Sequence, residues 1–247
     1  YTLSALMILF SIFSITFKGF NYGIDFSGGI LMELRSEDKI NVEDLRKQLS
    51  AVDLDEINLQ SIGEAGNEVV LRAQAKNLDE KQQMAVINQI KSTLGHAYEY
   101  RRVELVGPQV GGELKKASVI ASVIAVLAIS AYIWFRFEWQ FALGAMLGLI
   151  HDVVVTVGVL SFFDFDFSLT TVAAILTLAG YSVNDTVVTY DRIRENLRKF
   201  KKMSQFDLLN KSINDIFSRT ILTGCTTLLA ALALLIWGGD TLRSFSF

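Results

Sequence analysis

The sequence has very little cysteine, proline or histidine, and its net charge is small. A single cysteine, Cys225, excludes an internal disulfide framework. The single proline, Pro108, lies outside the long apolar runs, so a kink within a run would need glycine or inserted polar groups. The two histidines do not form metal-ligand spacing, and there is no phosphate-binding glycine loop. A formal charge of −3 gives no reason to expect a nucleic-acid partner.

Charge is also nearly missing from five long stretches, and these stretches decide the fold class. Runs of about 18 apolar residues are long enough to cross a bilayer as helices. Although 51% hydrophobic composition alone decides nothing, this distribution predicts a polytopic α-helical membrane protein. The first run is followed by Lys18-Gly19-Phe20-Asn21 and no cleavage site, so we interpret it as an uncleaved span. The runs are 1–17, 117–135, 140–162, 168–190 and 219–238.

The distribution of Lys and Arg predicts the orientation of the spans. Segment 191–219 is rich in both residues, whereas the connection 163–167 carries only Asp164 and Asp166 as charged residues. Basic residues near span ends accumulate in the cytoplasm. Segment 191–219 is therefore expected inside, and the large block 18–116 outside. The fifth span would then end on the outer side, so we expect a sixth span to follow it.

The block between the first two spans has the periodicity of a small α+β domain. Alternating and helical patterns follow each other in the order βαββαβ, which is typical of the ferredoxin-like split βαβ unit. Nothing in it suggests catalysis, and His96 is expected to be an exposed residue at a helix end. We therefore predict a binding or mechanical role and no enzyme. The expected elements are strand 30–34, helix 42–52, a hairpin of strands 57–62 and 68–73 across Gly63 and Gly66, helix 79–94 and strand 98–106.

Two glycine-bearing segments flank this domain, which we place at residues 20–113. The first, 23–29, contains Asp25, Gly28 and Gly29, and the second, 106–112, contains Gly107 and Pro108. Glycine permits unusual backbone angles and close backbone approach. We expect the segments to be hinges that couple domain and membrane, with Asp25 capping a turn. The rest of the chain is a truncated first helix, 1–19, and a membrane part, 114–247.

Ionisable residues inside spans are costly and are therefore functional candidates. Asp152 lies in the third span after His151, and Asp185 lies in the fourth span beside Asn184 on a polar face. A carboxyl group removed from water takes up a proton more readily, and a nearby Arg opposes this. Arg219, at the start of the fifth span, is either a snorkelling anchor or a partner for Asp185. Asp152 is alternatively a structural acceptor for a neighbouring helix.

The basic segment 191–218 is expected to be an amphipathic helix at the cytoplasmic membrane surface. Its charged residues include Asp191, Arg192 and Arg194, followed by spaced apolar positions. It serves either as an anchor or as a contact for a partner. In the third span, Gly144 and Gly148 form a small-xxx-small pattern that predicts close helix packing.

Four segments together resemble the SecD/SecF family of protein-export membrane proteins, within the resistance-nodulation-division superfamily. The resemblance covers essentially the whole chain, but this family has six spans. The fourth segment is long and specific. The segments are Gly23-Ile24-Asp25-Phe26-Ser27-Gly28-Gly29, Val106-Gly107-Pro108-Gln109-Val110-Gly111, Phe135-Arg136-Phe137-Glu138-Trp139 with His151-Asp152, and Gly180-Tyr181-Ser182-Val183-Asn184-Asp185-Thr186-Val187-Val188 through Tyr190-Asp191-Arg192-Ile193-Arg194-Glu195-Asn196.

The resemblance implies half of a resistance-nodulation-division-type transporter in the bacterial inner membrane, with its large domain in the periplasm. It implies SecD as the partner that supplies the other half, and contact with the SecYEG translocon, YajC- or YidC-type subunits, a translocating preprotein and membrane lipid. No cofactor is implied other than protons as the coupling ion, since the family uses the proton-motive force. Asp185 and Arg219 match charged residues associated with proton transport in the family, and Asp25 matches its signature aspartate.

Three other functions stay open at this point. Proton-coupled export of small molecules or lipids fits the superfamily, although it usually needs larger paired external domains. An intramembrane aspartyl protease would use Asp152 and Asp185 together, but neither lies in a Gly-x-Gly-Asp setting. In a purely structural partner, the charges would only bind helices together.

Overall fold

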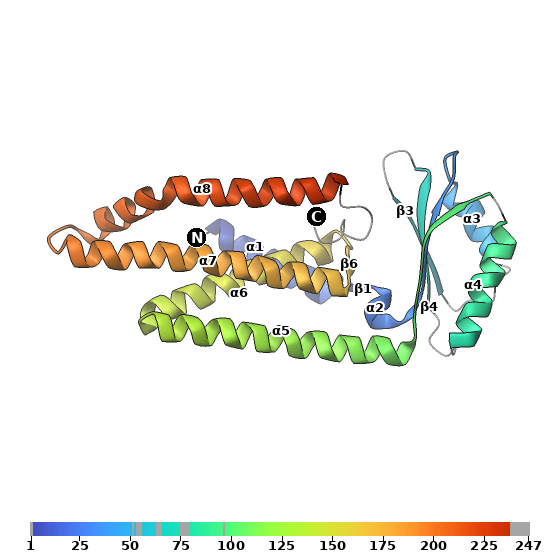
Figure 1. Cartoon of the computed structure of the whole chain (residues 1–247), viewed down its shortest axis with the longest axis horizontal. Helices are drawn as coiled ribbons and strands as arrows, with labels where there is room; N and C mark the ends of the chain where they lie inside the picture. The colour runs from blue at the N-terminus through green and yellow to red at the C-terminus, as the bar shows by residue number, and fades with distance from the viewer. Residues whose placement is uncertain are drawn as a thin grey trace. The chain divides into compact units, whose positions relative to one another are not determined.

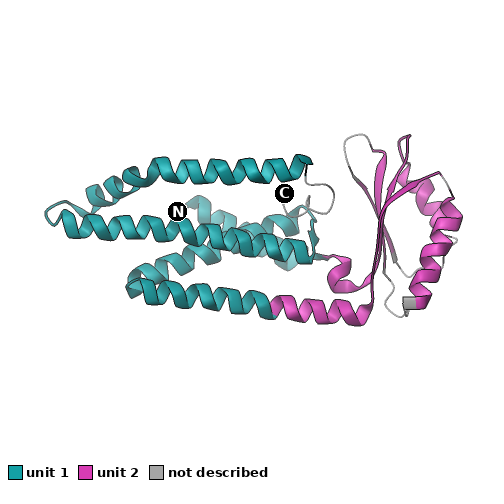
Figure 2. Ribbon diagram, in the orientation of Figure 1, with its two compact units in different colours: residues 1–21, 120–247 teal, residues 22–119 magenta. Residues whose placement is uncertain are grey.

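The computed structural model describes residues 2–50, 52, 56–62, 66–74, 80–95 and 97–237. It divides into two compact units, coloured separately in Figure 2. Unit 1 comprises residues 1–21 and 120–247, and unit 2 comprises residues 22–119. The boundary between the units falls inside helix α5, which starts at Pro108, whereas the sequence suggested a boundary at residue 113. His96, Gly63 and the C-terminal stretch 238–247, where a sixth span was expected to follow, lie outside the described residues.

Unit 1 is helical, and its helices coincide with the five predicted apolar runs (Figure 1). Among the described residues, four helices are long and apolar enough to cross a membrane, and α1 is a shorter apolar helix of 16 residues. The prediction of a polytopic membrane protein is therefore confirmed. The helices are α1 (Thr2–Phe17), α5 (Pro108–Arg136), α6 (Trp139–Phe162), α7 (Leu169–Lys199) and α8 (Gln205–Trp237).

Helices α1 and α6 pack closely because small residues face each other. A Cβ added to Gly158 would collide with Ser11. At the end of the same contact, the Ser14 hydroxyl donates to Ser161 Oγ at 3.2 Å, and Ser161 donates to the Gly19 carbonyl oxygen at 2.7 Å. Nearby, the short strands β1 (Asn21–Tyr22) and β6 (Asp166–Phe167) pair. These bonds satisfy polar groups that would otherwise be costly next to lipid.

The stretch 191–218 differs from its prediction as a separate amphipathic helix. Helix α7 continues without a break from the apolar run to Lys199, and α8 begins at Gln205 and continues into the last run. The stretch is therefore the end of one long helix, a short turn and the start of another. Polar pairs between the two helices, described below, explain why both helices extend beyond their apolar parts.

Unit 2 contains a four-stranded sheet in the order β3-β4-β2-β5, and every neighbouring pair is antiparallel. Strand β4 lies between β2 and β3, which makes the predicted split βαβ arrangement and confirms the ferredoxin-like βαββαβ order. The strands are β2 (Gly29–Arg35), β3 (Glu56–Ile62), β4 (Glu68–Gln74) and β5 (Glu99–Val106), and the helices are α2 (Ile24–Ser27), α3 (Val42–Leu49) and α4 (Glu80–Leu94).

The core of unit 2 lies between one face of this sheet and helices α3 and α4. Alternate side chains of a strand point to the same face, so Ile30, Met32 and Leu34 of β2 are all buried. Met32 lies opposite Leu71 in the register of β2 and β4. Leu45 and Leu49 of α3 and Ile87 and Ile90 of α4 complete the same cluster.

Candidate functional site

A cavity of about 630 Å³ opens among four helices of unit 1. The residues of α7 and α8 that line this cavity recur at spacings of three and four, so each helix presents one face to it. Asp152 and Asp185 both line it, although they come from different helices. The sequence could not establish that the two carboxyl groups share one space. The polar lining is His151, Asp152 and Thr156 of α6, Tyr181, Ser182 and Asp185 of α7, and Thr223 and Thr227 of α8; Met7 of α1 also lines it.

Asp152 is held on both of its carboxylate oxygens. The Ser182 hydroxyl donates to Asp152 Oδ2 at 2.6 Å, which links α7 to α6. His151 Nδ1 lies 2.9 Å from the other oxygen, Oδ1. The second ring nitrogen of His151, Nε2, is buried and has no hydrogen-bond partner among the residues that the structure describes. Asp152 is thus a fixed acceptor, with an unused histidine nitrogen beside it.

Asp185 is in a different situation in the same cavity. Its backbone carbonyl oxygen accepts a hydrogen bond from the Thr189 hydroxyl at 2.8 Å. Within the part of the chain that the structure describes, its carboxylate forms no hydrogen bond or ion pair. The side chain is half-buried. Among the described residues, one carboxylate of the cavity is therefore hydrogen-bonded and the other is not.

Of the two interpretations of Arg219, the ion pair with Asp185 is not formed among the described residues. Arg219 is exposed and does not line the cavity. It precedes Thr223 by four residues on α8, so its Cα lies about 6 Å along the helix axis from a cavity residue. Asn184 is also exposed and does not line the cavity. Neighbouring helix positions point in directions about 100° apart, which separates Asn184 from Asp185.

The ends of α7 and α8 are joined by a polar cluster that the sequence did not predict. The Asn196 side chain is buried, and its amide donates to Ser212 Oγ at 2.9 Å and to Asp215 Oδ2 at 3.2 Å. Arg192 pairs with Asp215 at 2.9 Å and with Glu195 at 2.6 Å. The hydrogen bond from Asn196, followed by that from Arg192, lowers the pKa of Asp215.

The other predicted charges of this region connect α7 to the end of α5. Asp191 forms an ion pair with Arg136 at 2.6 Å. Arg194 donates to the Arg136 carbonyl oxygen at 3.3 Å and lies over the ring of Phe137. Tyr190 packs edge-on against Phe137 and Phe141. These contacts hold α7 one to two turns beyond Asp185.

In unit 2, the two glycine-bearing segments pack against each other. Gly28 has a positive φ of 70°, and a Cβ there would lie 2.8 Å from the Cα of Pro108. A Cβ on Gly111 would lie 2.9 Å from the Gly28 nitrogen. Pro108 begins α5, the position that proline favours. Asp25 is half-buried in α2, and Gly29 pairs with Val106. The expected hinges are therefore a tight backbone contact.

Some cavity and cluster residues escaped prediction. Thr223, Thr227 and Gly224 form a repeat of small residues in the last apolar run, which was the available signal. No sequence signal marks Asp215, because its place in the polar cluster depends on the hydrogen bond from Asn196 on the other helix. Across the described residues, no three His, Cys, Asp or Glu side chains gather as a metal site.

Comparison with known families gives two matches. The model of "Protein export membrane protein SecD/SecF, C-terminal" matches residues 86–247, and that of the "SecD/SecF GG Motif" matches residues 13–40. The second match covers the segment that contains Gly28 and Gly29. The first covers the cavity residues of α6, α7 and α8.

Individual relatives resemble the whole chain. It is 46% identical to the protein translocase subunit SecF of Rickettsia bellii over 250 residues, which cover 100% of this chain and 82% of the relative. The SecF subunit of Rickettsia prowazekii is 45% identical, with 100% and 79% covered.

Solved structures of SecDF show the same fold. The crystal structure of SecDF, a translocon-associated membrane protein from Thermus thermophilus, superposes with a TM-score of 0.87 at 35% identity. That match covers 99% of this chain but 33% of the longer SecDF chain. A structure of SecDF in the super-membrane-facing form gives a TM-score of 0.66, also at 35% identity, with 99% of this chain and 34% of SecDF covered.

Proposed function

Since the chain belongs to the SecD/SecF family of protein-export membrane proteins, we propose that it is a SecF-type translocase subunit that couples proton movement to polypeptide export. A SecD-type protein is its partner, as the SecDF structures suggest. The subunit acts without being an enzyme itself. It works beside a SecYEG translocon, with YajC- or YidC-type subunits as further partners.

The observation that carries this proposal is the shared cavity of Asp152 and Asp185. Both come from membrane-spanning helices, where ionisable side chains are costly and mark proton paths. The Ser182 hydroxyl donates to Asp152 and holds that carboxylate in place. Asp185 has no donor in the described part of the chain. Asp185 is thus the carboxyl group that gains and loses the proton.

Loss and gain of charge at Asp185 would change the contacts between helices. An ionised Asp185 attracts a cation, and Arg219 lies about one helical turn from the cavity on α8. A protonated Asp185 no longer attracts it. Proton exchange would therefore change the position of α8 relative to α7, which is the kind of two-state element that coupling requires.

The basic residues indicate how the chain is oriented in the membrane. The α7–α8 turn lies in the cytoplasm of a bacterium, under the positive-inside rule, and unit 2 lies in the periplasm. There it meets the preprotein as it leaves the membrane. Since unit 2 shows no catalytic constellation in its described residues, it acts by binding or mechanically.

The test is Asp185→Asn in a complete translocase reconstituted in vesicles. Asparagine has nearly the same shape but cannot exchange a proton. We expect export with a proton gradient to fall to the level seen without one. Binding to the SecD-type partner, measured by co-purification, should be unchanged.

Asp164→Asn is the matched control. Asp164 lies outside the cavity at a positive φ of 60°, where asparagine is well tolerated. It should leave proton-driven export intact. Full proton-driven export by Asp185→Asn would contradict the proposal, and loss of partner binding in that variant would favour a purely structural role.

A further inference from the structure

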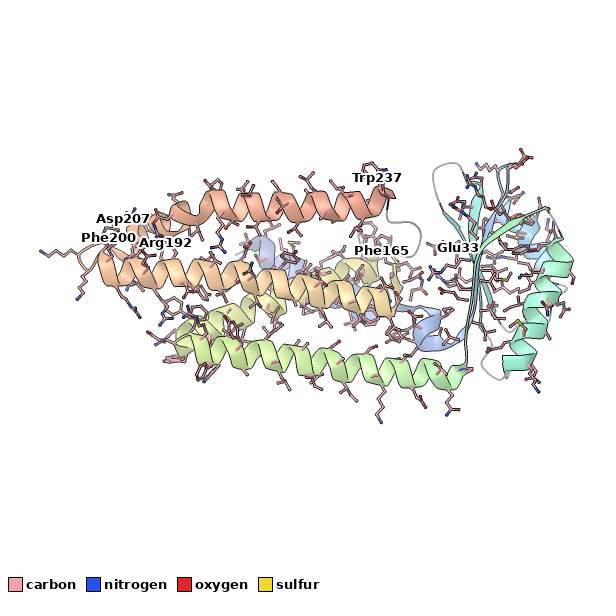
Figure 3. All side chains as sticks on the ribbon, viewed as in Figure 1. Glu33, Phe165, Arg192, Phe200, Asp207 and Trp237 are labelled. Atoms are coloured by element: carbon pink, nitrogen blue, oxygen red, sulfur yellow. The ribbon has the colours of Figure 1, made fainter. Side chains whose placement is uncertain are left out.

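The turn that joins α7 to α8 concentrates positive charge. Arg198, Lys199, Lys201 and Lys202 occur within five positions. They line an open hollow of about 730 Å³. Figure 3 labels Arg192 and Phe200 toward the end of α7 and Asp207 near the start of α8.

The positive charge of this hollow is not compensated. Among the described residues, none of these four basic side chains forms an ion pair or a hydrogen bond. Asp207 contributes a single carboxylate, which accepts a hydrogen bond from the Ser204 hydroxyl at 2.7 Å. By contrast, Lys211 on the adjoining turn of α8 is paired with Asp215 at 3.4 Å. The hollow therefore offers several free cations to an external anion.

The ring of Phe200 is in contact with two ammonium groups. The Nζ atoms of Lys199 and Lys211 each lie 5.5 Å from its centroid. A cation at this distance is attracted to the face of an aromatic ring. Lys199 is therefore oriented toward the hollow's aromatic residue, although no carboxylate neutralises it.

Large apolar side chains are exposed beside the cations. Phe206 is 75% exposed and Met203 is 37% exposed. Apolar groups next to Lys and Arg are typical of surfaces that lie in the membrane interface. Arg198 follows Tyr190, the end of the predicted span, by about 12 Å along α7. Long basic side chains extend back toward the headgroups.

We propose that the α7–α8 turn binds the phosphate groups of anionic phospholipids through Arg198, Lys199, Lys201 and Lys202. A cluster of basic residues directly beside a span attracts anionic lipid strongly. This goes beyond the function proposed above, because it uses none of the cavity residues. The contact between the hairpin and the membrane then depends on how much anionic lipid the cytoplasmic leaflet contains.

The test uses the full chain in nanodiscs of phosphatidylcholine with increasing phosphatidylglycerol. An environment-sensitive fluorophore on Met203→Cys, in a Cys225→Ser background, reports entry of the turn into the interface. We expect phosphatidylglycerol to shift the emission to the blue. In Lys201→Gln/Lys202→Gln, the fraction of phosphatidylglycerol needed for half of the shift should rise at least about twofold.

Lys81→Gln/Lys116→Gln is the matched control, since both lysines are exposed and lie far along the chain from the turn. Its titration should coincide with that of the parent. Coincident titrations of the parent and Lys201→Gln/Lys202→Gln would overturn the proposal. So would an equal shift produced by inorganic phosphate in pure phosphatidylcholine, or tighter binding of labelled RNA than of lipid at the same turn.

Discussion

Gly111 lies against Gly28 so closely that a Cβ on Gly111 would be 2.9 Å from the Gly28 backbone nitrogen and 3.3 Å from the Phe26 carbonyl oxygen. Both neighbours are backbone atoms, which cannot rotate away. The contact joins the segment before the first strand of unit 2 to the helix that follows its last strand. Only glycine fits there.

Gly111→Ala should therefore destabilise the contact by about 1–3 kcal/mol, the usual cost of overpacking. The expected result is a lower midpoint of thermal unfolding for the purified chain, followed by a probe in unit 2. Gly112→Ala is the matched control, because a Cβ at Gly112 meets nothing within 4 Å. Equal midpoints for the two variants would show that the backbone contact is not tight.

Ser182→Ala removes the donor that holds Asp152 Oδ2. A hydrogen bond to a charged group contributes about 1.5–3 kcal/mol, so proton-driven export should fall by about tenfold or more while the chain stays folded. Thr189→Ala deletes a hydroxyl from the same helix whose bond goes only to the Asp185 carbonyl oxygen. Export in vesicles by this control should stay near the parent's rate. If both variants lost proton-driven export to the same extent, the bond from Ser182 to Asp152 would have no specific role in export.

Gly144 faces Tyr190 across α6 and α7. A Cβ on Gly144 would lie 2.5 Å from the Tyr190 hydroxyl oxygen, whereas a Cβ on Gly148 meets nothing within 4 Å. Tyr190 is confined by Phe137 and Phe141. Gly144→Ala should lower the unfolding midpoint in detergent, and Gly148→Ala should not.

Removing the Tyr190 hydroxyl provides an internal check on that clash. In the double variant Gly144→Ala/Tyr190→Phe, most of the lost stability should return, because phenylalanine leaves room for the methyl group. A double variant as unstable as the sum of the two single ones would point to a different cause.

Acid should loosen the α7–α8 hairpin. Asn196, then Arg192, hold the pKa of Asp215 below its ordinary value of 3.8. A carboxyl group whose folded-state pKa is lowered stabilises the fold above its unfolded-state pKa, and this stability is lost as the pH falls through the lowered value. Hydrogen exchange of amides in 205–215 should stay slow down to a pH of about 4 and accelerate below it. Asp215→Asn should remove this pH dependence.

The sequence allowed prediction of whatever depends on local periodicity. Alternation at Ile30, Met32 and Leu34 predicted a strand with one buried face, and the scarcity of charge predicted each membrane helix. Asp185 was recognised because an ionisable residue in an apolar run is conspicuous. The family resemblance was confirmed by full-length relatives.

The relations between distant residues could not be predicted in the same way. The bond from Ser182 to Asp152 and the pairing of Asn196 with Ser212 depend on how helices are rotated about their axes, which periodicity fixes only roughly. For the same reason, the sequence left open whether Arg219 pairs with Asp185, and the described residues do not form that pair. The glycine contact depends on two segments about 80 residues apart, whose closeness no local pattern reveals.

Helix α8 is secured mainly near its beginning. Its buried residues are Leu208 and Ser212, and none of the residues in its most apolar stretch is buried within the chain. Asn196 and Arg192 of α7 bond to Ser212 and Asp215 in the same early turns of α8. The helix is 33 residues long, and its two buried residues lie within its first eight positions. A small rotation there would sweep Thr223 and Thr227 across the carboxylates, so a gate for protons would need no unfolding of the helix that forms it.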